Sequence, residues 1–150
     1  MKDVIIVSGG NIQRDFALDF LTRNKTEEVC LIAADRGVEF FKGTDWVPEV
    51  AVGDFDSLST EGAAYLETLR ETEVIRLKPE KDDSDTQSAA NYAIDHGAER
   101  ITILGATGKR IDHLMANFGL LVHGRERGAE IILIDQWNYM KLIESHTILK

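Results

Sequence analysis

Short runs of apolar residues recur along the chain, and glycine, aspartate or charged residues bound each run. They occupy residues 4–7, 29–33, 50–52, 74–77, 101–104 and 131–134. Continuous apolar runs of this length are typical of parallel strands that are buried on both faces. The pattern therefore predicts a sheet of buried, mostly parallel strands.

Amphipathic stretches separate these runs and predict helices. They cover residues 15–21, 60–69, 85–96 and 111–127, with a weaker one near 38–41. Strands that alternate with helices of this size favour a doubly wound, Rossmann-like α/β fold, which binds ligands beyond the carboxyl ends of its strands. Every polar or glycine-rich loop of interest here follows a predicted strand, so we expect these loops to gather at one edge of the sheet.

The last part of the chain has a different pattern. Residues 137–140 and 141–148 are expected to form short strands with no helix between them. We therefore predict an α/β domain over residues 1–135 and the start of a β-rich domain over residues 136–150.

Composition narrows the classes of function. A chain of 150 residues with 43% hydrophobic content can bury one well-packed core. Its net charge of −9 gives no general attraction to nucleic acid or to an anionic membrane. Cys30 is the single cysteine and lies in an apolar run, which favours a buried, reduced thiol. Because residues 1–7 lack the features of a signal peptide, a cytoplasmic protein is expected.

Carboxylates crowd two of the loops that follow strands. Asp54 and Asp56 come after the third predicted strand, and Asp82, Asp83 and Asp85 come after the fourth. Ionised carboxylates that converge repel one another, and a hard divalent cation relieves this repulsion, often together with phosphates. Metal-assisted phosphate chemistry is the leading interpretation.

The first acidic loop also has a purely structural interpretation. If the strand continues through it, Asp54 and Asp56 point to the same side while Phe55 turns to the core. Alternatively, the loop is a solvated turn in which Ser57 and Ser59 cap the next helix.

The second acidic loop opens a predicted helix. Ser84 and Gln87 have the spacing of a capping box, which places Asp85 in the first turn, where the helix dipole favours its ionised form. Lys78 and Lys81 could neutralise phosphate oxygens or simply balance the nearby aspartates.

Two further loops could contact a phosphate or another ligand. Residues 105–113 (GATGKRIDH) place two glycines before a helix, where backbone amides can bind phosphate, although the spacing matches neither a Walker loop nor a dinucleotide fingerprint. Asp112 and His113 are neighbours on a helix and diverge by about 100°, so they do not form part of a nucleophile triad. Asp35 follows a strand, where a ligand contact and a turn role are equally supported.

Three of these segments together resemble the catalytic domain of thiamine pyrophosphokinase, in order and at suitable intervals. They are GDFDS (residues 53–57), KDDSD (81–85) and GATGKRIDH (105–113). Residues 9–10 and 34–37 also resemble loops of this family. The family moves the pyrophosphoryl group of ATP to the hydroxyl of thiamine with Mg²⁺, giving thiamine diphosphate and AMP. The resemblance covers about the first 135 residues.

The resemblance implies roles for individual residues. Asp54, Asp56 and Asp85 would bind Mg²⁺, and Arg110 would join them in catalysis by neutralising charge. The nucleotide would contact Gly10, Asp35, Lys81, Thr107, Gly108, Arg110, Asp112 and His113. Ser84 and Gln87 replace the threonine and glutamate common in the family, and both keep the capping chemistry.

The resemblance also implies what lies beyond the α/β domain. Family enzymes continue into a smaller β-sandwich domain, and thiamine binds between domains at the interface of a homodimer. This chain enters that region at Trp137 and stops at Lys150. Two alternatives therefore remain open: a related diphosphokinase that acts on another heterocyclic alcohol such as a pterin, and a nucleotide-binding module without turnover.

Overall fold

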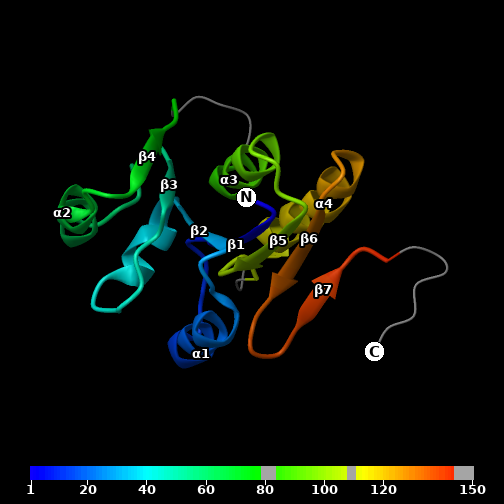
Figure 1. Cartoon of the computed structure of the whole chain (residues 1–150), viewed down its shortest axis with the longest axis horizontal. Coiled ribbons are helices and arrows are strands. Elements are labelled where there is room, and N and C mark those ends of the chain that lie inside the picture. The colour runs from blue at the N-terminus through cyan, green and yellow to red at the C-terminus, as the bar shows by residue number, and fades with distance from the viewer. Residues whose placement is uncertain (79–83, 108–110, 144–150) are drawn as a thin grey trace.

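A computed structural model of the chain describes residues 1–78, 84–107 and 111–143, with the backbone alone at residues 111–113. Within these residues one seven-stranded sheet runs through the molecule in the order β4-β3-β2-β1-β5-β6-β7 (Figure 1). Its strands are β1 (Asp3–Val7), β2 (Val29–Ala34), β3 (Val50–Gly53), β4 (Glu73–Arg76), β5 (Arg100–Leu104), β6 (Glu130–Ile134) and β7 (Tyr139–Lys141).

The sheet is parallel from β4 to β6, and β7 alone pairs antiparallel to its neighbour among the described strands. The described helical segments are α1 (Arg14–Asn24), the 3-10 helix η1 (Asp35–Phe41), α2 (Thr60–Thr68), α3 (Asp85–Asp95) and α4 (Ile111–Glu126). The predicted mostly parallel α/β sheet is therefore confirmed, and every predicted run from residue 4 to residue 134 overlaps an observed strand.

Helices cover both faces of the sheet, as Figure 1 shows with α1 on one side and α3 and α4 on the other. Along β1, the side chains of Val4 and Ile6 pack into the core under α3 and α4, whereas Ile5 and Val7 pack into the core under α1 and η1. Burial on both faces explains why the strands have no polar alternation. None of the described helices is both long and apolar enough to cross a membrane.

The strands predicted after residue 135 are only partly confirmed. The predicted boundary between residues 140 and 141 is wrong, because β7 runs through it and pairs Tyr139 with Ile134 and Lys141 with Ile132. This strand extends the main sheet. Most of the second predicted strand lies outside the described residues, so a β-rich domain over residues 136–150 stays a prediction.

The carboxyl ends of the parallel strands bring the predicted loops together. The residues after β1, β2 and β5 and the first turn of α3 line one cleft of about 540 Å³. The expectation that loops from distant parts of the chain meet at one edge of the sheet is confirmed for these four segments.

Candidate functional site

Two glycine-containing loops meet at the cleft. The amide of Gly10 donates to the carbonyl oxygen of Gly105 at 2.8 Å, so the loops after β1 and β5 touch directly. A Cβ atom on Gly10 would overlap that carbonyl oxygen, and Gly105 has a φ of +78°, where only glycine is comfortable. Glycine at both positions is therefore needed for the close approach of the two loops. The lining residues are Ser8, Gly9, Gly10, Asn11, Ala34, Asp35, Arg36, Ser84, Asp85, Thr86, Gly105, Ala106, Ala116 and Asn117.

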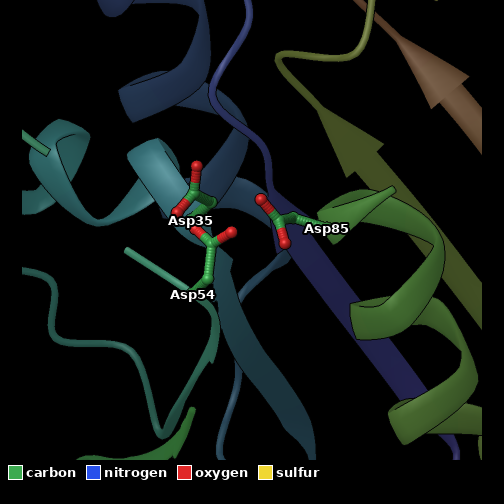
Figure 2. A group of neighbouring side chains, drawn as sticks. All are labelled: Asp35, Asp54 and Asp85. Atoms are coloured by element: carbon green, nitrogen blue, oxygen red, sulfur yellow. The ribbon is translucent and has the colours of Figure 1, made fainter. Parts of the chain in front are cut away.

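Three carboxylates converge beside these loops, and two of them, Asp35 and Asp85, line the cleft. Asp35, Asp54 and Asp85 each place one oxygen so that all three oxygens lie within 4.8 Å of one another. Figure 2 shows the side chains pointing toward one another from three separate segments. The first follows β2, the second follows β3, and the third opens α3. All three are half-buried. We call these three residues the carboxylate group.

Asp35 organises the loop that carries Asp54. Its Oδ1 accepts the backbone N–H of Phe55 at 3.0 Å, and its Oδ2 accepts the hydroxyl of Ser57 at 2.5 Å. Gly53 permits the approach, because a Cβ there would lie 3.0 Å from the Asp35 Cα. A single carboxylate thus fixes the first acidic loop against the end of β2.

The expected strand-like alternation of the first acidic loop is wrong. Strand β3 ends at Gly53, and Phe55 takes a φ of +64°, which reverses the chain while its ring stays buried. Asp56 is consequently exposed and lies outside the carboxylate group. Its backbone N–H donates to Asp54 Oδ1 at 3.0 Å. The turn alternative is therefore also partly correct, and Ser59 caps α2 by accepting the Gly62 amide at 2.9 Å.

The electrostatics of the carboxylate group favour a cation. Burial raises the pKa of Asp35, and the negative charges of Asp85 and Asp54 raise it further. The hydrogen bonds from Ser57 and Phe55 oppose this rise without cancelling it. The three ionised side chains therefore carry a repulsion that a divalent ion would remove.

Three hydroxyl groups fix the start of α3. The Oγ of Ser84 accepts the backbone N–H of Gln87 at 3.1 Å, which confirms the Ser84 half of the predicted capping box. The hydroxyl oxygens of Thr86 and Ser8 lie 2.5 Å apart in a buried contact between α3 and the end of β1. These bonds place Asp85 in the first helical turn, where the dipole favours its negative charge.

The remaining predicted residues fall into three sets. Gly10 lines the cleft, as expected for a nucleotide contact. The hydroxyl of Thr107 donates to Asp135 Oδ2 rather than pointing into open space. The third set cannot be placed: Lys81, Gly108 and Arg110 lie outside the described residues, and only the backbone is described at Asp112 and His113.

Sequence reasoning missed Ser8, Thr86 and Asn117, which all line the cleft. Asn117 donates from Nδ2 to the Ala106 carbonyl oxygen at 2.8 Å and supports the loop after β5. Only Ser8 had a usable signal, since it is the first polar residue after a buried strand. The other two lie inside helices, where polar residues are ordinary.

A family comparison agrees with the geometry. Residues 22–133 match a sequence model of the family described as the catalytic domain of thiamin pyrophosphokinase. A curated thiamine pyrophosphokinase of Bacillus subtilis is 31% identical over 144 residues, which cover 95% of this chain and 64% of that protein.

Solved structures show the same relationship. The crystal structure of the Bacillus subtilis thiamine pyrophosphokinase superposes with a TM-score of 0.76 at 30% identity, covering 90% of this chain and 61% of the other. The structure of a thiamin pyrophosphokinase family protein from Enterococcus faecalis gives a TM-score of 0.69 at 37% identity, covering 90% and 62%. The chain thus spans somewhat less than two thirds of the length of these relatives.

Proposed function

Because the chain belongs to the thiamin pyrophosphokinase family, we propose that it serves in the transfer of the pyrophosphoryl group of ATP to the hydroxyl of thiamine, giving thiamine diphosphate and AMP. The observation that carries this proposal is the convergence of Asp35, Asp54 and Asp85 beside the cleft at the carboxyl edge of the sheet. Crevices at this edge are where open α/β sheets bind ligands. Metal-bound phosphates also fit a chain whose net charge is −9.

The carboxylate group fits a divalent magnesium ion. One oxygen from each of its three side chains lies within 4.8 Å of the other two, so the three side chains could hold one small ion between them after a modest closure. Hard oxygen ligands suit Mg²⁺, which commonly keeps positions for water and substrate phosphates. When bound, the ion supplies positive charge to the phosphates of ATP.

The three carboxylates have different tasks in this proposal. Asp54 and Asp85 bind the ion directly, because both carry a carboxylate oxygen into the carboxylate group. Asp35 holds the Asp54 loop through Phe55 and Ser57 and offers a further oxygen. Asp56 remains a predicted ligand whose exposed side chain lies two residues from Asp54, and its own variant tests it.

The nucleotide is proposed to lie along the glycine loops. Gly10 lines its site, Gly108, Lys81 and Arg110 contact its phosphates, and Thr107, Asp112 and His113 complete its surroundings. Arg36 adds an exposed guanidinium at the cleft, where it pairs with Glu39 at 3.5 Å. Transfer at phosphorus depends mainly on positioning and on neutralisation of negative charge, so no general base has to be assigned.

Several further properties belong to the same proposal. The described sheet would be the Rossmann-like half of a two-domain enzyme, with a β-sandwich that begins near residue 136 and completes the thiamine site. The assembled enzyme would be a cytoplasmic homodimer. The described α/β part supplies the metal and nucleotide half of the site.

Product analysis tests the proposal. The chain, and any longer natural product that contains it, are incubated with ATP, Mg²⁺ and thiamine, and the nucleotides are separated by chromatography. We expect AMP and thiamine diphosphate in equal amounts, with neither formed by the Asp54→Asn variant. Release of ADP instead of AMP would contradict the proposal, and AMP release with a hydroxymethylpterin but not with thiamine would favour the alternative acceptor. If such a longer product releases AMP while this chain only binds ATP, the chain by itself is the nucleotide-binding module.

A further inference from the structure

A hydrogen-bonded node at Asp135 joins the loop after β5 to the turn between β6 and β7. The Thr107 hydroxyl donates to Asp135 Oδ2 at 2.5 Å across 28 positions of the sequence. The other carboxylate oxygen, Oδ1, accepts the backbone N–H groups of Trp137 at 2.8 Å and Asn138 at 2.7 Å. The side-chain amide of Asn138 also donates to Oδ1 at 3.0 Å.

These donors keep the carboxylate of Asp135 ionised. Burial alone would raise its pKa, but the hydrogen bonds from Thr107, Asn138 and Trp137 outweigh burial and hold the pKa below its ordinary value. A carboxylate near a phosphate-binding loop would ordinarily repel the ligand. Here several hydrogen-bond donors stabilise the negative charge of Asp135, so this carboxylate can hold such a loop in place.

The node is one of three attachments on consecutive residues. Gly105 accepts from the amide of Gly10 at 2.8 Å, and Ala106 accepts from Asn117 at 2.8 Å. Thr107 is held by Asp135. Each residue of this short segment is therefore fixed by a different part of the fold: the loop after β1, helix α4 and the end of β6. A loop fixed in this way presents its backbone without first losing conformational freedom on binding.

The bond also limits what Thr107 itself can do. A threonine hydroxyl carries one hydrogen, and Asp135 receives it. The hydroxyl is then unable to donate to a phosphate oxygen. Gly105 and Ala106, by contrast, line the cleft.

We infer that Asp135 is a positioning residue for nucleotide binding, which acts by holding the Thr107 hydroxyl so that the backbone of residues 105–107, rather than this side chain, meets the phosphates. The inference rests on the proposed function, because it takes ATP as the ligand of the cleft. It assigns Thr107 a structural tether in place of a direct phosphate contact.

Calorimetric titration of the chain with Mg²⁺ and a nonhydrolysable ATP analogue tests this. Thr107→Val keeps the shape and removes the hydrogen, Asp135→Asn keeps an acceptor for the turn, and Thr107→Ser keeps the hydroxyl. We expect Thr107→Val and Asp135→Asn each to weaken nucleotide binding by roughly fivefold, the value of one hydrogen bond. Thr107→Ser should bind normally. The double variant should bind no more weakly than either single one, because both remove the same interaction.

Three further readouts separate this role from general damage. Thermal unfolding of Thr107→Val should stay cooperative and show only the small loss of stability expected for one hydrogen bond. Mn²⁺ binding without nucleotide should be unchanged, and in any longer natural product that contains the chain the KM for ATP should rise while that for thiamine stays constant. Normal nucleotide binding by Thr107→Val, or additive losses in the double variant, would overturn this inference and leave the proposed function intact. If the unsubstituted chain binds no nucleotide, the proposed function fails and the inference fails with it.

Discussion

The hydroxyl oxygens of Ser8 and Thr86 lie 2.5 Å apart, although 78 positions of the sequence separate them. Ser8 directly follows β1, and Thr86 lies in the first turn of α3, directly after Asp85. Both side chains are buried, with 9% and 8% of their surface exposed. The contact therefore fixes the start of α3 against the middle of the sheet and sets the position of Asp85 relative to Asp35 and Asp54.

Replacing Thr86 by valine tests this contact. The substitution keeps the shape and leaves the buried Ser8 hydroxyl without its partner, which costs about 1–3 kcal/mol. We expect the free energy of unfolding in urea to fall by this amount and the affinity for Mn²⁺ to fall as well. Thr86→Ser is the matched control and should resemble the unsubstituted chain. Equal stability of the valine and serine variants would show that the contact does not hold α3.

For Asp35→Asn, in contrast to Thr86→Val, we predict no fall in the free energy of unfolding at neutral pH. Burial and the charges of Asp85 and Asp54 raise its pKa above the ordinary 3.8, so the folded chain binds a proton more tightly than the unfolded chain. The stability from Asp35 is therefore fully present below this value and is lost as the pH rises through the raised pKa. We expect Asp35→Asn to unfold no more easily than the unsubstituted chain at pH 7 in EDTA.

Urea unfolding across pH measures this difference. The gap in stability between Asp35→Asn and the unsubstituted chain should shift in favour of the variant as the pH rises above 3.8. Asp35→Ala is the control, because it also loses the acceptors for Phe55 and Ser57 and should be destabilised. A gap that does not change with pH would contradict the proposed repulsion within the carboxylate group.

The sequence predicted the strands well because their apolar runs are continuous and each is buried on both faces. It also correctly predicted that Asp54 and Asp85 lie at the same edge of the sheet, because the carboxyl ends of parallel strands share that edge. It left the role of Asp35 open, and it predicted a continuing strand through Asp54 and Asp56, whereas β3 ends at Gly53 and Asp56 is exposed. The reason is the backbone reversal at Phe55, whose φ of +64° is not signalled by an aromatic residue. Pairs such as Ser8 with Thr86 depend on helix placement, which local patterns do not specify.

Gly10 and Gly119 form a contrasting pair of glycines. A Cβ at Gly10 would overlap the Gly105 carbonyl oxygen, whereas a Cβ at Gly119, within α4, meets nothing within 4 Å. We expect Gly10→Ala to lower the free energy of unfolding by about 1–3 kcal/mol and to weaken nucleotide binding. Gly119→Ala should raise stability by about 0.5–1 kcal/mol because alanine favours the helix. Thermal unfolding of both variants measures this, and a neutral Gly10→Ala would contradict the close contact of the two loops.

The thiol of Cys30 should react slowly with alkylating reagents in the folded chain. Burial raises the pKa of Cys30 to about 11 from its ordinary 9.0, and the charge of Glu49 adds to the rise. At pH 8 the folded chain then holds roughly a hundredfold less thiolate than the unfolded chain, and only the thiolate reacts. Alkylation by iodoacetamide should be correspondingly slower without urea than with it. In Glu49→Gln the folded chain should react faster; comparable rates in folded and unfolded chains would contradict the shift.

The carboxylate group makes the last and most direct prediction. Mn²⁺ binding, followed by electron paramagnetic resonance, is compared among the unsubstituted chain, Asp54→Asn, Asp85→Asn and Asp56→Asn. Asp15→Asn is the matched control, because Asp15 is likewise an acid in the first turn of a helix but is exposed on α1. Asp56→Asn decides whether that exposed side chain also reaches the ion.

Loss of a direct ligand should weaken metal binding by at least about tenfold, and the stability of the apo chain should change little. We predict this loss for Asp54→Asn and for Asp85→Asn, with normal binding by Asp15→Asn. Near-normal Mn²⁺ affinity in either Asp54→Asn or Asp85→Asn would show that these carboxylates do not share an ion, and the proposed metal site would be wrong.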